Sequence, residues 1–302
     1  MIKEEKLIRF DWAIKTVLRD KANYDVLEGF LSSLLKEEIK ILNILESESN
    51  NEEGQKFNRV DLIVEDSKGK KIIIEIQNQR ESDYIERLLW GASKVVVESL
   101  ELGSMYKDIV KVISVSILYF NLGTGDDYIY YGNTEFKGIH TGKPLIIKQK
   151  VTIPGEIEKI KYVEKGNVFP EYYLIRVNNF NDNVKEDIDE WVYMFKNSEV
   201  KKEFKSKNID KAKQKLDILK MSKEEKQKYE KYLENVASEI DIIETAKEEG
   251  REEGREEERE KAKEDKIKIA KKMLRRGTSV NIVAEDTELS IEEVENIKFL
   301  AM

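Results

Sequence analysis

Two β-branched segments joined by a short turn constrain the fold of this chain more than any other feature of its sequence. The segments cover residues 60–65 and 71–77, and the turn Asp66-Ser67-Lys68-Gly69, followed by Lys70, separates them. A three-residue hairpin loop with glycine at its left-handed position is a common connection between antiparallel strands. Such a loop predicts these pairs along the hairpin: Asp66 with Lys70, Glu65 with Lys71, Ile63 with Ile73, and Asp61 with Glu75.

The predicted register sorts the side chains of the hairpin onto two faces, because strand side chains alternate with a period of two. One face carries Asp61, Glu75 and Gln77. The other is the predicted core face and carries the apolar residues Leu62, Val64, Ile72, Ile74 and Ile76. A slip of one residue would break both the loop and the apolar pattern, so the two signals favour the same register.

The polar face of this hairpin indicates a metal site. Two adjacent carboxylates repel each other unless a cation lies between them. Oxygen ligands of this kind suit Mg²⁺ or Mn²⁺, which can lower the pKa of an attacking water and neutralise charge on a phosphodiester. Gln77 would orient that water or a phosphate oxygen. The alternative is an ordinary solvated sheet face, because polar residues often alternate with isoleucine on such a face.

Composition excludes several other classes of chemistry. The 302 residues include no cysteine and one histidine, which excludes disulfides, thiolate metal sites and cysteine nucleophiles and disfavours histidine zinc sites and Ser-His-Asp triads. No apolar run approaches the ~18–20 residues of a membrane span, and no apolar leader opens the sequence. We therefore expect a cytoplasmic protein with no membrane association. The net charge of −8 argues against nonspecific coating of nucleic acid but not against a DNA enzyme.

The remaining periodicity predicts an α/β protein. Helical spacing covers residues 4–36, with a break at Asn23, and again residues 84–102. Residues 109–120 form a nearly uncharged run that is typical of a strand buried on both faces. Further along, the pattern predicts a strand at 172–180 and a helix at 188–195 that contains Trp191.

A lysine-rich stretch follows at 201–231, with twelve lysines against six acidic residues. Lys201, Lys202 and Lys205 are candidate phosphate contacts, which would be independent of DNA sequence and sensitive to salt. The favoured alternative is a pair of solvated amphipathic helices with Leu216, Leu219 and Met221 turned inward.

The last part of the chain is predicted to be helical. In residues 244–266, eighteen of 23 residues are charged, and their spacing is typical of a solvated helical rod or coiled coil. Residues 267–299 resemble a small helix-turn-helix, but Glu292, Glu293 and Glu295 on its last helix would repel DNA phosphates. Partner binding or homo-oligomerisation through the C-terminal helix is therefore the expectation.

Several of these segments together resemble one known family. Across residues 8–121, the order and spacing of six segments resemble the Rpn-type recombination-promoting nucleases and putative transposases of the PD-(D/E)XK superfamily. These segments are Phe10 to Leu18, Arg59-Val60-Asp61, Lys71 to Gln77, Arg87, Gly103 to Tyr106, and Val112 to Ile117. Trp191 and the charged C-terminal helix extend a looser similarity. The resemblance implies a restriction-endonuclease-like α-β-β-β-α-β core, followed by a mixed or helical region, a long charged helix and a small C-terminal helical unit.

The resemblance also implies roles for single residues. Asp61 and Glu75 would be the metal ligands, with Mg²⁺ or Mn²⁺ as the cofactor, and Gln77 would take the position that is lysine in the wider superfamily. Glutamine is neutral and would stabilise a developing charge less well, which predicts slow turnover.

Three further residues have both a functional and an ordinary interpretation. Asp11 and Lys15 lie four residues apart and would supply a fourth acid and a phosphate-side lysine, or else form a simple helical ion pair. Arg87 would meet the scissile phosphate, or else be a surface arginine beside Glu86 or Asp83.

The sequence thus predicts three regions: a nuclease-like core at 1–125, a mixed extension at 126–240, and a charged helix with a small helical unit at 241–302. The predicted function is metal-dependent DNA endonuclease activity linked to recombination or transposition. The alternative is a noncatalytic binding or assembly module that keeps the nuclease fold and acts through its C-terminal helix.

Overall fold

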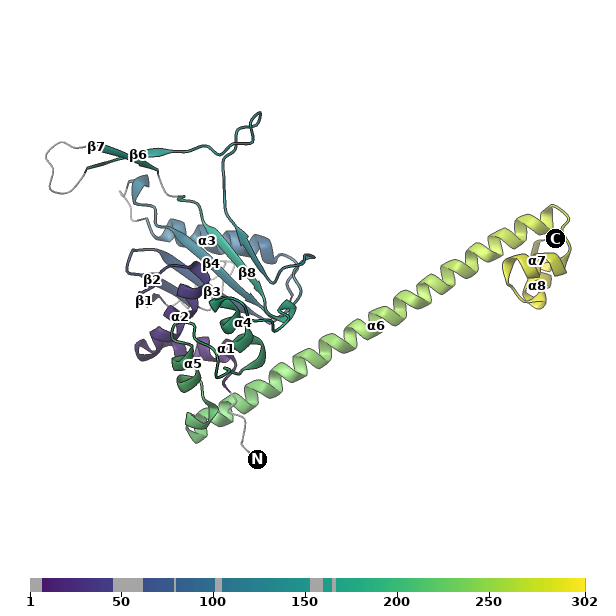
Figure 1. Cartoon of the computed structure of the whole chain (residues 1–302). Helices are drawn as coiled ribbons and strands as arrows, with labels where there is room; N and C mark the ends of the chain where they lie inside the picture. Colours follow the sequence, from purple (N-terminus) through teal and green to yellow (C-terminus); the bar gives the residue numbers. More distant parts are fainter. Residues whose placement is uncertain are drawn as a thin grey trace. The chain divides into compact units, whose positions relative to one another are not determined.

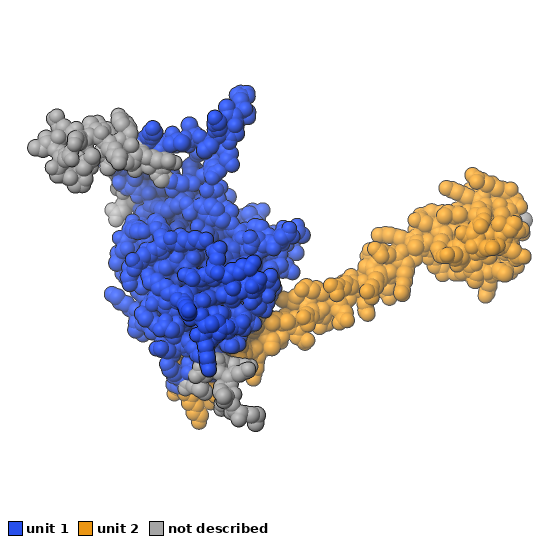
Figure 2. Space-filling view, viewed as in Figure 1, with its two compact units in different colours: residues 1–222 blue, residues 223–302 orange. Residues whose placement is uncertain are grey.

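The computed structural model describes residues 7–45, 62–78, 80–100, 105–152, 160–164 and 167–301. The chain divides into two compact units, residues 1–222 and residues 223–302, which Figure 2 colours separately. The predicted division at residues 125 and 240 stays a prediction.

A mixed six-stranded sheet forms the centre of unit 1 (Figure 1). Its strand order is β1-β2-β3-β4-β8-β5, in which β3, β4 and β8 are parallel and the outer strands are antiparallel to their neighbours. The strands cover β1 Ile41–Leu45, β2 Leu62–Asp66, β3 Lys71–Gln77, β4 Val112–Leu118, β5 Ile129–Gly132 and β8 Glu171–Arg176. All seven residues of β4 are buried, as predicted for residues 109–120.

The hairpin of β2 and β3 has the predicted register. Glu65 pairs with Lys71 and Ile63 pairs with Ile73. Gly69 adopts a φ of 74°, the left-handed conformation that the turn requires. The Asp66 carboxylate accepts hydrogen bonds from the backbone N–H groups of Lys68 and Lys70 at 2.9 and 2.8 Å, which closes the turn. Asp61, which precedes β2, lies outside the described residues, so its predicted pairing with Glu75 stays a prediction.

Helices cover both faces of the sheet (Figure 1). On one face α3, Tyr84–Glu98, packs Ala92 and Val95 against Ile73 and Val112. On the other lie α1, Phe10–Lys15, α2, Tyr24–Leu35, and α4, Asp187–Asn197. An aromatic cluster joins these three helices: Phe10, Phe30, Trp191 and Phe195, with ring centroids 4.2–6.4 Å apart.

The first helical region differs from the expectation of one helix over 4–36 with a single break. The helix α1 ends at Lys15, and short 3-10 turns at Val17–Arg19 and Lys21–Asn23 precede α2. Two local hydrogen bonds compete with a continuous helix here. The Thr16 hydroxyl donates to the Trp12 carbonyl at 2.8 Å, and the Asp20 carboxylate accepts from the Ala22 N–H at 2.9 Å. Residues 4–6 lie outside the described ranges.

Shorter elements complete unit 1. The strands β6, Lys148–Thr152, and β7, Ile160–Glu164, form a separate two-stranded antiparallel sheet. The helix α5 covers Ile209–Lys215, and 3-10 turns lie at Tyr106–Asp108, Val177–Asn179 and Ile218–Lys220. In the lysine-rich stretch, Leu216 is buried as predicted and Met221 is partly buried, whereas the side chain of Leu219 lies outside the description.

Unit 2 is entirely helical. The charged helix α6 covers Lys223–Arg275 and is longer than the predicted charged segment. It is followed by α7, Val280–Thr287, and α8, Ile291–Ala301, as predicted for a small terminal helical unit. The end of α6 and the two short helices share a core of Ala270, Val283, Ala284, Leu289, Val294 and Ile297. Among the helices that the structure describes, none is both long and apolar enough to span a bilayer.

Candidate active site

Glu75 lies on β3, on the face of the sheet that α3 covers. Its strand neighbours are β2 on one side and β4 on the other, where Ser116 pairs with Glu75. Residues 73, 75 and 77 share a face by strand alternation, and Ile73 packs against α3. Glu75 is accordingly 4% exposed. The alternative of an ordinary solvated face is therefore wrong at this position.

Glu75 belongs to an acid–arginine cluster, which we define as Glu75, Gln77, Glu81 and Arg87. The Arg87 Nη2 group donates to Glu75 Oε1, and its Nη1 group donates to both oxygens of Glu81 at 2.6 Å. The Gln77 Nε2 group also donates to Glu81 Oε1, at 2.6 Å. The Glu81 carboxylate thus binds both Gln77 and Arg87, and Arg87 also binds Glu75.

The electrostatics of the cluster keep Arg87 charged. Burial by itself would lower the pKa of Arg87, but the negative charges of Glu75 and Glu81 outweigh it and raise that pKa. A buried carboxylate such as Glu75 needs a nearby cation or several donors, because desolvation of an unpaired charge is costly. In this structure Arg87 supplies that positive charge.

Tyr84 is a buried residue close to the charges of the cluster. It lies three residues before Arg87 on α3 and is 1% exposed. Burial raises the pKa of Tyr84, and the charge of Glu75 raises it further. The phenol therefore stays protonated at neutral pH.

Asp11 lies near the end of β3 but is bonded to a different set of residues. Its Oδ2 atom accepts from Arg9 Nη2 at 2.8 Å and from Asn78 Nδ2 at 3.1 Å. The Arg9 guanidinium also lies 5.3 Å from the ring centroid of Tyr119, which follows β4. Asn78 directly follows Gln77, so each of the two groups includes a residue at the carboxyl end of β3.

The sequence-predicted site residues are placed as follows. Glu75, Gln77 and Arg87 come together in one cluster, whereas Asp11 contacts Arg9 and Asn78. Asp61 lies outside the described residues, as does the side chain of Lys15, so their roles stay predictions.

The candidate DNA-binding lysines lie between α4 and α5. The Lys201 ammonium lies 4.3 Å from the ring centroid of Tyr193, and the Lys205 backbone N–H donates to the Glu190 carboxylate at 2.8 Å. Lys202 is exposed. Lys201 and Lys205 therefore each contact α4.

Sequence reasoning missed Glu81, Arg9 and Asn78. The expected partners of Arg87 were Glu86 or Asp83, but its carboxylate partners are Glu75 and Glu81. Glu81 lies in the connection between β3 and α3, where no periodic pattern marks a residue. The one available signal is its position, four residues after Gln77 and six before Arg87.

The chemistry of the donors fits a hard divalent cation. Glu75 offers carboxylate oxygens, and Gln77 offers an amide oxygen because its nitrogen bonds Glu81. Within the described ranges, no three His, Cys, Asp or Glu side chains form a group that could hold a metal ion. Asp61, the other predicted ligand, lies outside those ranges.

Comparison with known proteins identifies the family. The family model described as PD-(D/E)XK nuclease family transposase matches residues 8–246 of this chain. Searches of curated proteins and of solved structures found no match. The matched range includes the hairpin, the acid–arginine cluster and the whole six-stranded sheet. The chain therefore belongs to the PD-(D/E)XK nuclease family transposases.

Proposed function

We propose that this protein is a metal-dependent DNA endonuclease that hydrolyses phosphodiester bonds, in a process linked to recombination or transposition. Family membership supports a nuclease- or transposase-like role. The observation that carries the finer proposal is Glu75, a carboxylate buried in the middle of the sheet, together with a hairpin register that pairs Ile63 with Ile73. If that pairing continues by two residues, Asp61 lies opposite Glu75.

Asp61 and Glu75 would hold Mg²⁺ or Mn²⁺. A bound divalent ion of this kind supplies Lewis-acid chemistry and lowers the pKa of a coordinated water. Both residues offer the carboxylate oxygens that such ions prefer.

Gln77 and Arg87 would act on the substrate. Because Glu81 fixes the amide nitrogen of Gln77, the amide oxygen has a defined orientation and would position a water or a metal-bound group. Arg87 remains charged and would approach the scissile phosphate, for which a guanidinium is well suited. Gln77 is neutral, so we expect slower turnover than a lysine at this position would give.

The other predicted residues would act at the edge of this site. Asp11 would support the carboxyl end of β3 through Asn78, with Lys15 as a phosphate-side cation. Lys201, Lys202 and Lys205 would add sequence-independent contacts to DNA phosphates.

The decisive test is substitution of the two proposed metal ligands. Asp61→Ala and Glu75→Ala should each abolish Mg²⁺-dependent nicking or cleavage of plasmid DNA, because each removes a ligand oxygen. Glu65→Ala serves as the control, since Glu65 lies on the same hairpin opposite Lys71. Circular dichroism would establish that each variant is folded. Unchanged cleavage by either folded variant would refute the site.

The alternative function is noncatalytic assembly through the C-terminal helices. It is favoured by one observation, that α7 and α8 form a separate small core with the end of α6. In that case the wild-type chain would form homo-oligomers in sedimentation experiments but would cleave no DNA with Mg²⁺ or Mn²⁺.

A further inference from the structure

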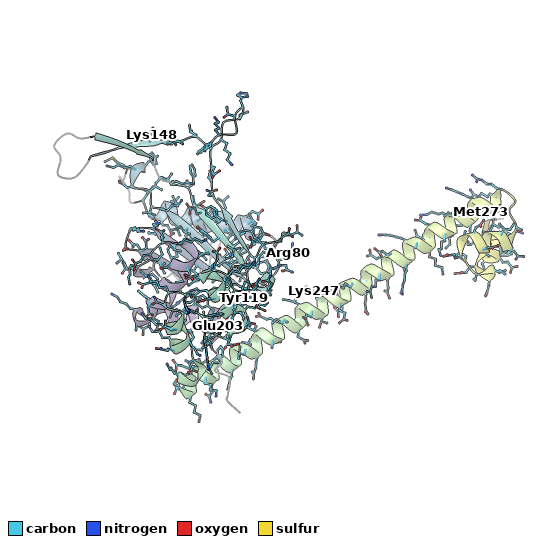
Figure 3. All side chains as sticks on the ribbon, viewed as in Figure 1. Arg80, Tyr119, Lys148, Glu203, Lys247 and Met273 are labelled. Atoms are coloured by element: carbon cyan, nitrogen blue, oxygen red, sulfur yellow. The ribbon has the colours of Figure 1, made fainter. Side chains whose placement is uncertain are left out.

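Residues 133–148 form a projecting hairpin that the proposed site does not use, and we call it the arm. Its two sides are held together by an isolated bridge between Lys137 and Pro144, with backbone hydrogen bonds from Leu145 N to Phe136 O at 2.7 Å and from Gly138 N to Lys143 O at 2.9 Å, and its last residue, Lys148, begins β6. Every residue from 133 to 148 is exposed. Figure 3 shows Lys148 where the arm passes into β6, apart from Arg80 and Tyr119.

The base of the arm is anchored to the rest of unit 1. The Asn167 side chain donates to the Thr134 carbonyl at 3.0 Å, and the rings of Phe136 and Phe169 lie 5.5 Å apart. Lys111 in turn donates to the carbonyls of Asn167 and Phe169 at 2.9 and 2.7 Å. These contacts set the direction of the hairpin, so it is a built element of the fold.

The charge of the arm is opposite to that of the whole chain. The arm holds three lysines, at positions 137, 143 and 148, and one acidic residue, Glu135, so its net charge is positive although the chain as a whole has a net charge of −8. Lys137 contacts Glu135 at the base, at 3.0 Å. Apolar side chains accompany the lysines: Ile139 at the tip is 96% exposed and Leu145 is 65% exposed.

We infer that the arm is a second DNA-contacting element, which binds the phosphates of a duplex through Lys137, Lys143 and Lys148. A narrow basic hairpin fits a polyanion by charge, and a two-stranded ribbon is thin enough to enter a DNA groove. The inference rests on the proposed function for its choice of DNA as the polyanion.

The arm lies at a distance from the proposed site of DNA cleavage. The arm follows β5, whose last residue, Gly132, pairs with Tyr172 near the start of β8, and β8 begins at Glu171, which lies at the level of Ile72 in the parallel strands. Gln77 is five residues further along β3, which is roughly 17 Å at ~3.3 Å per residue. That distance corresponds to about five base-pair steps of duplex. The arm would therefore contact DNA outside the scissile step and would affect binding more than chemistry.

The test is DNA binding by the full chain in EDTA, measured by fluorescence anisotropy. The triple variant Lys137→Gln, Lys143→Gln, Lys148→Gln should bind a duplex of about 30 base pairs roughly 10-fold or more weakly than wild type. The slope of log Kd against log salt should fall by about 2–3, since each lost phosphate contact removes ~0.9.

A second triple variant controls for the change in net charge. It is Lys36→Gln, Lys68→Gln, Lys94→Gln, in which each lysine has a carboxylate partner on unit 1: Glu186, Glu37 and Glu98. This control should bind the same duplex within about twofold of wild type. Equal weakening by both triple variants, or no binding by wild type, would overturn the inference. Because binding is measured without a divalent ion, a failure of cleavage bears on the proposed function alone.

Two other binding partners of the arm would give distinct results. Binding of wild type to phosphatidylserine vesicles that is lost on Ile139→Ser, with DNA binding unchanged by the lysine variants, would identify a lipid-binding arm instead. Concentration-dependent dimerisation that Ile139→Ser abolishes, again with unchanged DNA binding, would identify contact with a second copy of this chain. Either result would overturn the inference.

Discussion

At the scale of single residues, Glu81 organises the candidate site although it is not a proposed metal ligand. Its carboxylate accepts from both Gln77 and Arg87 at 2.6 Å. Hydrogen bonds that involve a charged group are roughly twice as strong as neutral ones, and two of them at one carboxylate fix its partners in space. Glu81 is therefore a positioning residue, which acts on the reaction through Gln77 and Arg87.

Glu81→Gln should lower kcat of DNA cleavage by roughly 10–100-fold, the usual cost of losing a supporting contact of this kind. KM should change much less, because Gln77 and Arg87 remain present but lose their fixed orientation. Steady-state cleavage assays separate the two quantities, and Glu81→Asp should restore part of kcat. Glu86→Gln is the matched control, since Glu86 is exposed on α3, the helix that carries Arg87. An equal loss in both glutamine variants, or a change in KM alone, would contradict the positioning role.

At the scale of elements, α2 lies unusually close to two other segments of unit 1. A Cβ atom on Gly29 of α2 would lie 2.8 Å from Cζ2 of Trp191 and closer still to the carbonyl oxygen of Lys207. Real Cβ contacts are not this short, so only glycine permits this approach. Trp191 is fully buried and belongs to the aromatic cluster that also holds Phe30 of α2.

Gly29→Ala should therefore destabilise unit 1 by about 2 kcal/mol or more, as overpacking of a core does. The measurement is the shift of the urea unfolding midpoint. Gly250→Ala on α6 is the control, because a Cβ there meets nothing within 4 Å. Alanine at that site should stabilise the helix by ~1 kcal/mol. A neutral or stabilising effect of Gly29→Ala would show that the approach of α2 to Trp191 is looser than the structure has it.

At the scale of the molecule, the two units have separate hydrophobic cores. The candidate active site and the aromatic cluster belong to unit 1, whereas the core around Val283 and Val294 belongs to unit 2. Separate cores allow separate unfolding transitions. This arrangement permits a test that distinguishes catalysis from assembly.

Val294→Ala should destabilise the unit 2 core by ~2 kcal/mol, because Val294 is fully buried there. Hydrogen exchange would localise the loss to α7, α8 and the end of α6. DNA cleavage by unit 1 should stay within about twofold of wild type, since the substitution lies outside the matched family range. A comparable loss of cleavage would instead tie the proposed activity to the C-terminal helices.

The sequence by itself determined the local parts of this protein. Turn chemistry at Gly69 and strand alternation were enough to predict the pairing of Glu65 with Lys71, because both act between neighbouring residues. The buried strand β4 and the terminal helical unit were predicted from hydrophobic runs and periodicity in the same way.

Only the tertiary structure decided which distant groups surround Glu75. The helix α3 buries that carboxylate and supplies Arg87, and Asp11 meets Asn78 although 67 residues separate them. Alternation specifies that Glu75 shares a face with Gln77, but not whether water or a helix covers that face. Packing between elements decides whether a helix covers that face. The packing energy depends on contacts between distant residues, which local sequence patterns do not specify.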